Sequence, residues 1–477
     1  MKKPSIATKT IFGSADLFGG GALNMVGFYY LIFLTDVVQI SPAYAGAIVL
    51  ASRIWDAVTD PAMGVIVDRT RTRFGKRRPY FMAAVVTVFI SMVVLWYPVA
   101  WADEVARVLF ALFGYLFFST VSTTVMVPYL SMQPELTSDY NERTSLNVFK
   151  MAFSFIASII AAIVPMTIVR AFADIRTGYL AMGLVFGVFY ALPWIGISLH
   201  IRERDNRSDP PPPRFSFGDI LVPLRIRTFR MLILIYLGAF LTLDVMSSVI
   251  AFAMTYLFNR PDDLQTVLGT LIVTQIVFLP FISTLTGRFG KNKVLVATAF
   301  VWMAGVAAIA VMPRAVPLPA LLGLAVVTGV GVSGCMVIPW TMYPDATDVG
   351  MLVTGRDVAG SFGGSMTFFR KLASALALFI VGLVLDLSGY LAPFQETIDG
   401  VTQNVIREQP AAALTTIRFL LVGLPLLLLG MAGIVAARYP LTPEVHARLS
   451  LHVRRLRGEE VEPLEEADVE ALRKTLV

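Results

Sequence analysis

The chain has 477 residues, of which 56% are hydrophobic and 15% are charged, and its formal net charge is +6. A soluble globular protein carries about 25% charged residues, so this composition excludes an ordinary soluble domain and indicates a membrane protein. The apolar residues are spread over the whole chain rather than gathered at its start. Because Met1-Lys2-Lys3 leads into a polar stretch, we expect no cleavable signal peptide.

About twelve stretches are long and apolar enough to cross a bilayer. A spanning helix needs about 20 mostly apolar residues, whereas a barrel strand has about 10 residues that alternate in polarity. The lengths therefore predict an all-α polytopic membrane protein with twelve transmembrane helices in two six-helix halves. The spans are expected near residues 11–36, 43–68, 79–101, 105–133, 145–170 and 178–201, and near residues 230–258, 265–287, 294–313, 317–343, 358–388 and 413–437.

Basic residues concentrate in the loops that follow the even-numbered spans. The opposite loops are short and almost free of Lys and Arg, as at Asp103-Glu104 and Asp262-Asp263, or longer and polar, as near residues 389–412. Since basic loops stay in the cytoplasm, we expect a bacterial inner-membrane protein with both termini cytoplasmic. The basic residues are Arg69, Arg71, Arg73, Lys76, Arg77 and Arg78 after the second span and Arg288, Lys291 and Lys293 after the eighth.

The placement of these basic residues also indicates the class of partner. They lie in loops on one side of the membrane, so we expect no nucleic-acid partner. The expected partners are membrane lipid, a small organic or amphiphilic substrate and a coupling cation, and the chain is expected to be a monomer.

A charged linker at residues 202–229 divides the chain. Its run Pro210-Pro211-Pro212-Pro213 is stiff and cannot continue a helix, so we predict one domain at residues 1–201 and another at 230–437. Arg73-Phe74-Gly75-Lys76 recurs as Arg288-Phe289-Gly290-Lys291, each time after the second span of its half. This equivalence indicates a duplication, and two six-helix halves are the architecture of a major facilitator-type transporter.

Residues 438–477 form a polar tail. Thr442-Pro443-Glu444 is typical of an N-cap, a first-turn proline and a first-turn acid. We predict that they open an amphipathic helix that ends near Gly458, as a cytoplasmic surface element.

Two acids stand inside the second predicted span. Asp56 and Asp60 are spaced i, i+4, so both carboxylates fall on one helix face about one turn apart. An ionisable group at the bilayer centre costs about 2.5–3.5 kcal/mol, and two like charges in a low-dielectric site raise each other's pKa. A cation or proton between them would relieve both costs, and the missing N–H of Pro61 leaves a carbonyl free for a polar partner. The pair therefore predicts a coupling-ion site.

Other interpretations of the intramembrane charges remain open. Asp56 could pair with Arg53 while Asp60 only caps or packs. Lys371, in the eleventh span, could approach the acids or could extend to a helix end. Asp244 in the seventh span and Lys150 in the fifth are either site residues or helix-end charges.

Several functional classes are disfavoured. The three histidines, His200, His446 and His452, lie at or beyond the cytoplasmic boundary, and no Gly-rich phosphate loop is present. The single cysteine, Cys335, lies in an apolar run and allows no intrachain disulfide. We therefore expect no enzyme activity, no cofactor and no transition metal, and transport driven by Na⁺, by protons or by the solute's own gradient. A cation-independent uniporter or a lipid flippase is the alternative.

The residues around the acids resemble a known family. Arg53-Ile54-Trp55-Asp56-Ala57-Val58-Thr59-Asp60-Pro61-Ala62-Met63-Gly64, followed by Arg71-Thr72-Arg73-Phe74-Gly75-Lys76-Arg77-Arg78-Pro79, resembles the signature of the glycoside-pentoside-hexuronide:cation symporters. Thr35-Asp36-Val37-Val38, Glu142-Arg143-Thr144 and Pro339-Trp340 support the resemblance along the chain.

This resemblance implies roles for individual residues. Asp56 and Asp60 would bind sodium or a proton, and Thr123 would add its hydroxyl. Thr59 stands where the family has an asparagine ligand, so it is a further candidate. Lys371 would couple the cation site to the substrate site.

The resemblance also has implications for the class of substrate. Where sugar carriers of the family have two acids that hold the sugar, this chain has Gly20 and Met126, and Asn24, Lys150 and Asp244 complete the candidate substrate residues. Short matches, Val127-Pro128-Tyr129 among them, also resemble sodium-dependent lysophosphatidylcholine symporters. A cavity that lacks carboxylates suits an amphiphile better than a small polyol, whereas the family itself favours a sugar or glycoside.

Overall fold

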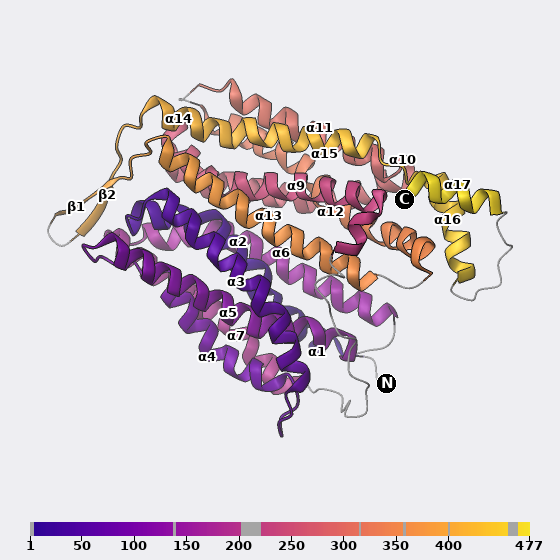
Figure 1. Cartoon of the computed structure of the whole chain (residues 1–477). Helices are drawn as coiled ribbons and strands as arrows, with labels where there is room; N and C mark the ends of the chain where they lie inside the picture. Colours follow the sequence, from indigo (N-terminus) through magenta and orange to yellow (C-terminus); the bar gives the residue numbers. More distant parts are fainter. Residues whose placement is uncertain are drawn as a thin grey trace. The chain divides into compact units, whose positions relative to one another are not determined.

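The computed structural model of the chain describes residues 4–136, 140–201, 221–313, 316–355, 359–398, 401–456 and 466–477. The regular secondary structure of these residues is helical, apart from one β-hairpin and an isolated bridge between Thr72 and Gly75 (Figure 1), which confirms the predicted all-α membrane fold. The proline run of the predicted linker and the predicted end of the tail helix at Gly458 lie outside the described residues.

The first half of the chain forms seven α-helices, because its opening span is divided at Ala15 into α1 and α2. A π-helical turn, η1, follows α2. The elements are α1 (Ile6–Ser14), α2 (Asp16–Ile32), η1 (Phe33–Val37), α3 (Pro42–Arg69), α4 (Arg78–Leu95), α5 (Glu104–Leu136), α6 (Tyr140–Arg170) and α7 (Ile175–His200).

The second half repeats this pattern, and two further helices follow. The elements are η2 (Val222–Arg225), α9 (Arg227–Phe252), η3 (Ala253–Leu257), η4 (Pro261–Asp263), α10 (Leu264–Phe289), α11 (Lys291–Ala310), α12 (Leu318–Thr354), α13 (Ala359–Leu387), β1 (Phe394–Ile398), β2 (Val401–Val405), α14 (Ala411–Arg418), η5 (Phe419–Gly423), α15 (Leu424–Ala437), α16 (Pro443–Leu456) and α17 (Glu466–Leu476).

Eleven helical segments among the described residues are long and apolar enough to span a membrane, and each coincides with a predicted span. The remaining predicted span is α3. Its 28 residues, at a rise of about 1.5 Å each, exceed the roughly 30 Å of a bilayer core. Its charged side chains lower its hydropathy, and they include Asp56 and Asp60 of the predicted cation site.

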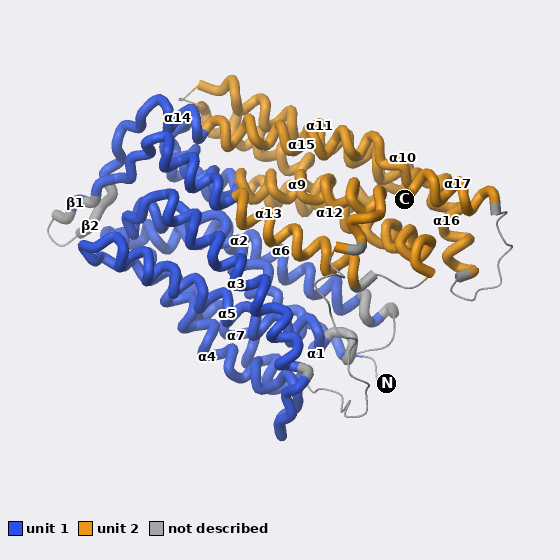
Figure 2. Tube along the Cα trace, in the orientation of Figure 1, with its two compact units in different colours: residues 1–210, 247–269, 378–417 blue, residues 211–246, 270–377, 418–477 orange. Residues whose placement is uncertain are grey.

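The described chain divides into two compact units (Figure 2). Unit 1 comprises residues 1–210, 247–269 and 378–417, and unit 2 comprises residues 211–246, 270–377 and 418–477. The boundaries within α9, α10 and α13 differ from the predicted ones, and the division into two six-helix halves stays a prediction.

Large aromatic side chains fill the core of unit 1. Trp96, Trp194 and Tyr190 are each 0% exposed. Phe81 stacks on Trp194 with ring centroids 5.7 Å apart. These rings join α4 and α7, which pack against each other along their length.

Small residues set the closest helix contacts in both units. In unit 1, a Cβ added at Gly46 of α3 would lie 3.0 Å from the Phe379 carbonyl oxygen of α13, and Gly382 faces Gly46 across this contact. In unit 2, Gly331 of α12 lies against Trp302 of α11. Glycine at such positions allows two helix backbones to approach within membranes.

The first predicted span of each half ends in the same local backbone geometry. Each of these spans ends in a π-turn, η1 in the first half and η3 in the second. Two residues after each turn lies a left-handed residue, Gln39 with φ of 62° and Asn259 with φ of 52°. The next N–H then reaches back to the same position of each turn, from Ile40 to the Leu34 carbonyl and from Arg260 to the Met254 carbonyl. The two halves therefore resemble each other in backbone geometry here, in addition to the repeated Arg-Phe-Gly-Lys sequence.

A buried polar cluster lies where η1 meets η3. The Asp36 carboxylate accepts hydrogen bonds from Thr35 at 2.7 Å, Tyr256 at 2.8 Å and Tyr390 at 2.6 Å. Burial raises the pKa of the Tyr390 hydroxyl, so it stays protonated and donates. The cluster lies entirely within unit 1.

Two connecting segments bear on the sequence predictions. The polar loop expected near residues 389–412 contains an antiparallel hairpin, with Phe394 opposite Val405 and Ile398 opposite Val401, which was not predicted. The predicted tail helix is confirmed as α16, and its start is capped, because the Val445 N–H donates to the Thr442 hydroxyl at 3.4 Å.

Candidate functional site

The predicted acid pair lies on α3, which packs along α5 within unit 1. α3 continues through Pro61 without a break, so Asp56 and Asp60 keep their i, i+4 spacing on one helix face. Asp56 is buried, with 9% of its surface exposed. The arrangement that the sequence predicted on α3 is therefore present.

Each acid accepts a hydrogen bond from a hydroxyl of α5. The Thr123 hydroxyl donates to the Asp60 carboxylate at 2.6 Å, and the Ser119 hydroxyl donates to the Asp56 carboxylate. Ser119 and Thr123 are themselves spaced i, i+4, and both are buried, at 3% and 6% exposed. The two carboxylates of α3 therefore pair with the two hydroxyls of α5, and the two pairs are one helical turn apart.

This group of four side chains presents only oxygen atoms. Hard monovalent cations prefer oxygen ligands, whereas soft metals prefer sulfur and nitrogen. The carboxylates can also take up a proton. The arrangement is therefore suited to Na⁺ or H⁺.

Arg53 lies beside the acid pair. Its Nη1 is 3.7 Å from the Asp56 Oδ2, so the pairing left open by the sequence is present as a long ion pair. Arg53 also lines a cavity of about 30 Å³ together with the apolar side chains of Val26, Leu31 and Val49. Arg53 is therefore shared between the acid pair and this cavity.

Thr59 is oriented differently from Thr123. Its hydroxyl donates to the Trp55 carbonyl of the preceding turn at 2.9 Å. The indole N–H of Trp55 donates to Thr120 at 2.8 Å, which adds a second polar link between α3 and α5. The hydroxyl proton of Thr59 is thus engaged within α3, and its role as a cation ligand stays a prediction.

Three predicted substrate residues lie where α2 meets α5 and α6. The Asn24 amide donates to Ser158 at 2.8 Å, and a side chain at Gly20 would overlap Ser154. The methyl group of Met126 lies against Gly19. These residues are close to one another, and their substrate role stays a prediction.

Lys150 lies in the same region of unit 1. Its ammonium group is 5.4 Å from the centre of the Tyr129 ring, and it interacts electrostatically with Asp16. Asp16 is 8% exposed. Asp16 of α2 therefore lies one turn before Gly20, the position at which the sugar carriers that the sequence resembles have an acid.

Asp244 belongs to an ion pair in unit 2. The Arg370 guanidinium donates to both carboxylate oxygens of Asp244, at 2.5 and 2.7 Å, and lies 5.0 Å from the centre of the Phe240 ring. Bidentate pairs of this kind are the strongest ionic hydrogen bonds in proteins. Lys371 follows Arg370 on α13, and its coupling role stays a prediction.

Sequence reasoning missed three residues of these sites. Ser119 precedes Thr123 by the same four residues that separate the acids, which was the signal for it. Asp16 is a charged residue inside the predicted first span, near residues 11–36, and this charge was the signal for it. Arg370 adjoins Lys371, but its pairing with Asp244 depends on how α9 packs against α13.

Two known proteins that are similar to this chain in sequence are named as symporters. A symporter of Synechocystis, described as uncharacterized, is 28% identical and covers 93% of this chain and 96% of its own length. The sodium-dependent lysophosphatidylcholine symporter 1-B of Danio rerio is 24% identical and covers 88% of this chain and 84% of its own length.

A solved structure shares the fold at low identity. The bacterial homologue of the human lysosomal transporter Spinster, in an inward-facing and occupied conformation, has a TM-score of 0.66 at 12% identity and covers 93% of this chain and 96% of its own. The sequence profile described as MFS/sugar transport protein matches residues 11–443. The chain therefore belongs to the MFS/sugar transport protein family, and it is a multi-pass membrane transporter rather than an enzyme.

Proposed function

We propose that this transporter is a cation-coupled symporter whose cation site is formed by Asp56, Asp60, Thr123 and Ser119. The observation that carries the proposal is the repeated carboxylate–hydroxyl pairing between α3 and α5. Na⁺ is the preferred ion because the four groups offer oxygen ligands only, and H⁺ is the other candidate. The names of the Synechocystis and Danio rerio relatives, both symporters, support coupling.

The energy source follows from the charge of the ion. One unit charge moving down a potential of 100 mV releases about 2.3 kcal/mol, which can concentrate a neutral solute tens-fold. Binding of the cation between the two acids would stabilise the state that binds substrate, and the two halves would then alternate in access to the two sides. The predicted link through Lys371 belongs to this mechanism.

We propose a lysophospholipid-type amphiphile as the substrate, with a sugar or glycoside as the other candidate. Gly20 and Met126 occupy positions where the family's sugar carriers have acids. Arg53 offers a charge for an anionic head group. The name of the Danio rerio relative supports the amphiphile, whereas the family description supports the sugar.

The location in the cell is part of the same proposal. The basic loops after the even-numbered spans favour a bacterial inner membrane with both termini in the cytoplasm.

Uptake into proteoliposomes tests the coupling. We expect a Na⁺ gradient or a proton gradient to drive uptake of lysophosphatidylcholine by the unaltered chain, and Asp60→Asn to abolish that stimulation. Thr124→Val is the matched control, because the Thr124 hydroxyl of α5 donates to the Thr120 carbonyl and not to an acid. Stimulation that survives in Asp60→Asn would refute the coupling role, and uptake of a glycoside in place of the lysolipid would reassign the substrate.

A second candidate function rests on the Arg53–Asp56 ion pair. If this pair makes Asp56 purely structural, the protein would be a cation-independent uniporter or a lipid flippase. Transport that is insensitive to every monovalent cation and to pH would favour this candidate.

A further inference from the structure

The tail helix α16 is docked on α12 within unit 2. Leu449 and Val453, one turn apart on α16, are 0% and 1% exposed, so they form the apolar face of the docking contact. Thr442 caps the start of the helix, and its carbonyl accepts the His446 N–H at 2.8 Å. The cap therefore fixes His446 in the first turn of α16.

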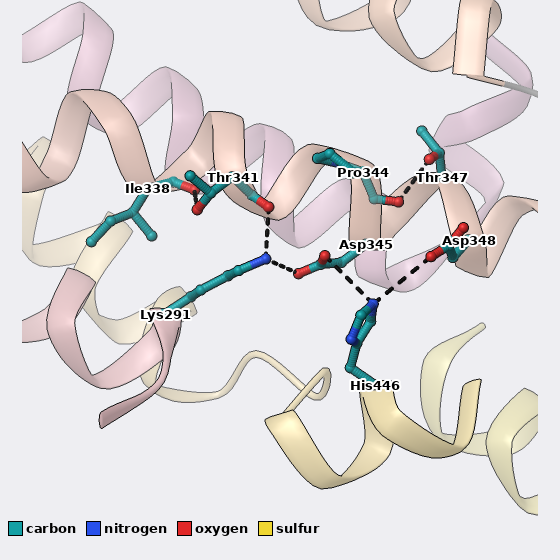
Figure 3. A network of polar contacts seen from close by, with 8 residues as sticks. All are labelled: Lys291, Ile338, Thr341, Pro344, Asp345, Thr347, Asp348 and His446. Atoms are coloured by element: carbon teal, nitrogen blue, oxygen red, sulfur yellow. Dashed lines mark hydrogen bonds and ion pairs between the residues drawn. The ribbon is translucent and has the colours of Figure 1, made fainter. Parts of the chain in front are cut away.

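His446 points from α16 toward two acids near the end of α12 (Figure 3). Its Nε2 lies 3.5 Å from the Asp345 Oδ1 and 3.8 Å from the Asp348 Oδ2. The Lys291 ammonium group of α11 lies 2.6 Å from the other Asp345 oxygen and donates to the Thr341 carbonyl at 2.8 Å. One imidazole of the tail thus faces two carboxylates of a membrane helix.

The charge of the cluster depends on His446. Asp345 and Asp348 contribute two negative charges and Lys291 one positive charge, so the three groups sum to −1 while the imidazole is neutral. A protonated imidazole brings the sum to zero. Other titratable or charged groups on and beside α16 have interactions of their own. Tyr439 interacts with Asp345, Glu444 interacts with Lys293, and Arg448 pairs with Asp468.

The cluster favours the protonated imidazole. The nearby Asp348 carboxylate raises the pKa of His446 above its ordinary value of 6.5, and Asp345 adds to the effect, while burial and Lys291 oppose it. A group whose pKa is raised on docking stabilises the docked state fully below its undocked pKa, and the stabilisation is lost as pH rises through the docked pKa. The docked tail should therefore be most stable in mildly acidic conditions.

We propose that His446 is a pH-sensitive latch: the imidazolium bridges Asp345 and Asp348 to hold α16 on α12, and loss of the proton loosens this contact. A histidine is suited to such a switch because its charge changes near neutral pH. The latch acts on the tail and does not depend on cation coupling at Asp56 and Asp60.

A second attachment limits the motion to α16. At the end of α17, the Leu476 carbonyl accepts a hydrogen bond from the Thr228 hydroxyl, and a main-chain oxygen of the next residue, Val477, accepts the Arg227 N–H at 3.0 Å. Leu476 is 0% exposed. These contacts contain no group that titrates near neutral pH, so pH should change the docking of α16 and leave that of α17 in place.

Hydrogen–deuterium exchange of the full chain in lipid nanodiscs tests the latch. After correction for the intrinsic pH dependence of exchange, protection of residues 443–456 should be several-fold higher at about pH 5.5 than at about pH 8.5. His446→Gln should remove this difference. His452→Gln is the matched control on the same helix, because burial and the nearby Arg455 and Arg473 lower the pKa of His452, so it should retain the difference.

Direct titration keeps the test decisive if a variant folds poorly. The chain has three histidines, so their NMR titration in labelled protein can be assigned by the two substitutions. The pKa of His446 should lie above that of His452, and Asp348→Asn should lower it. Equal protection of α16 at both pH values, or a pH dependence that survives in His446→Gln, would overturn the proposal.

Discussion

The Thr123 hydroxyl donates a 2.6 Å hydrogen bond to the Asp60 carboxylate. Sixty-three residues separate the two, and the same separation relates Ser119 to Asp56. The two helices therefore meet in a register that repeats every four residues, and each acid has its own hydroxyl. This relationship makes the proposed cation site open to test one hydroxyl at a time.

Thr123→Val should weaken cation binding and leave the fold intact. A hydrogen bond to a charged group contributes about 1.5–3 kcal/mol, so the apparent Na⁺ affinity should fall about 10- to 100-fold. Sodium titration of uptake, or of thermal stability, measures the change. Thr124→Val should leave the affinity unaltered, and an equal effect of both substitutions would show that the loss comes from packing.

Asp244→Asn should reduce stability more than it reduces substrate affinity. The substitution leaves the partly buried Arg370 guanidinium without its bidentate carboxylate. Loss of one partner of a buried pair costs about 3–5 kcal/mol, and we expect about half of that because both side chains are about one-fifth exposed. Thermal unfolding measures it. The exchange Asp244→Arg with Arg370→Asp should recover part of the loss, whereas weaker substrate binding at unchanged stability would assign Asp244 to the substrate site.

Gly382→Ala should destabilise the protein, because the added Cβ would overlap the Pro42 carbonyl oxygen of α3. Gly364→Ala on the same helix is the matched control. Among the described residues, no atom outside the adjoining turns of its own helix lies within 4 Å of its Cβ position, and alanine favours a helix over glycine by about 1 kcal/mol. The two substitutions should therefore shift the unfolding temperature in opposite directions. A stabilising Gly382→Ala would contradict the close approach of α3 and α13.

Tyr390→Phe should destabilise unit 1, because it removes a hydrogen bond to the buried Asp36 carboxylate. Leaving a buried charged acceptor with one donor fewer costs about 1–3 kcal/mol. Unfolding by heat or denaturant measures this loss. Tyr44→Phe provides the comparison, since Tyr44 is 51% exposed, and equal losses in the two variants would show that Asp36 does not depend on Tyr390.

The sequence was sufficient for the helices and for the spacing of the acids. Apolar length alone located the spans, and α3 was recognised by its length although it carries Arg53, Asp56 and Asp60. The i, i+4 geometry of the acids follows from the helix itself and needed no partner. Local properties of the chain were therefore predictable.

The partners of the acids depended on packing between helices. The spacing of Ser119 and Thr123 on α5 matches that of the acids, but it does not fix which face of α5 meets Asp56, because the register of α5 against α3 is set by side chains of both helices. The hairpin at β1 and β2 had a local signal that was not used, since Asp399-Gly400 between the strands is a typical two-residue hairpin turn. Those two residues lie outside the described part of the chain.

The π-turns at η1 and η3 also record the history of the protein. A π-turn arises when one residue is inserted into an α-helix, and such turns are rare. Both halves carry one at the end of their first span, followed by a left-handed residue and the same backward hydrogen bond. Two independent insertions at one position require more events than a single insertion in an ancestor of half the length. A single insertion that preceded the predicted duplication therefore accounts for η1 and η3, whereas the third π-turn, η5, lies at a position without this equivalence.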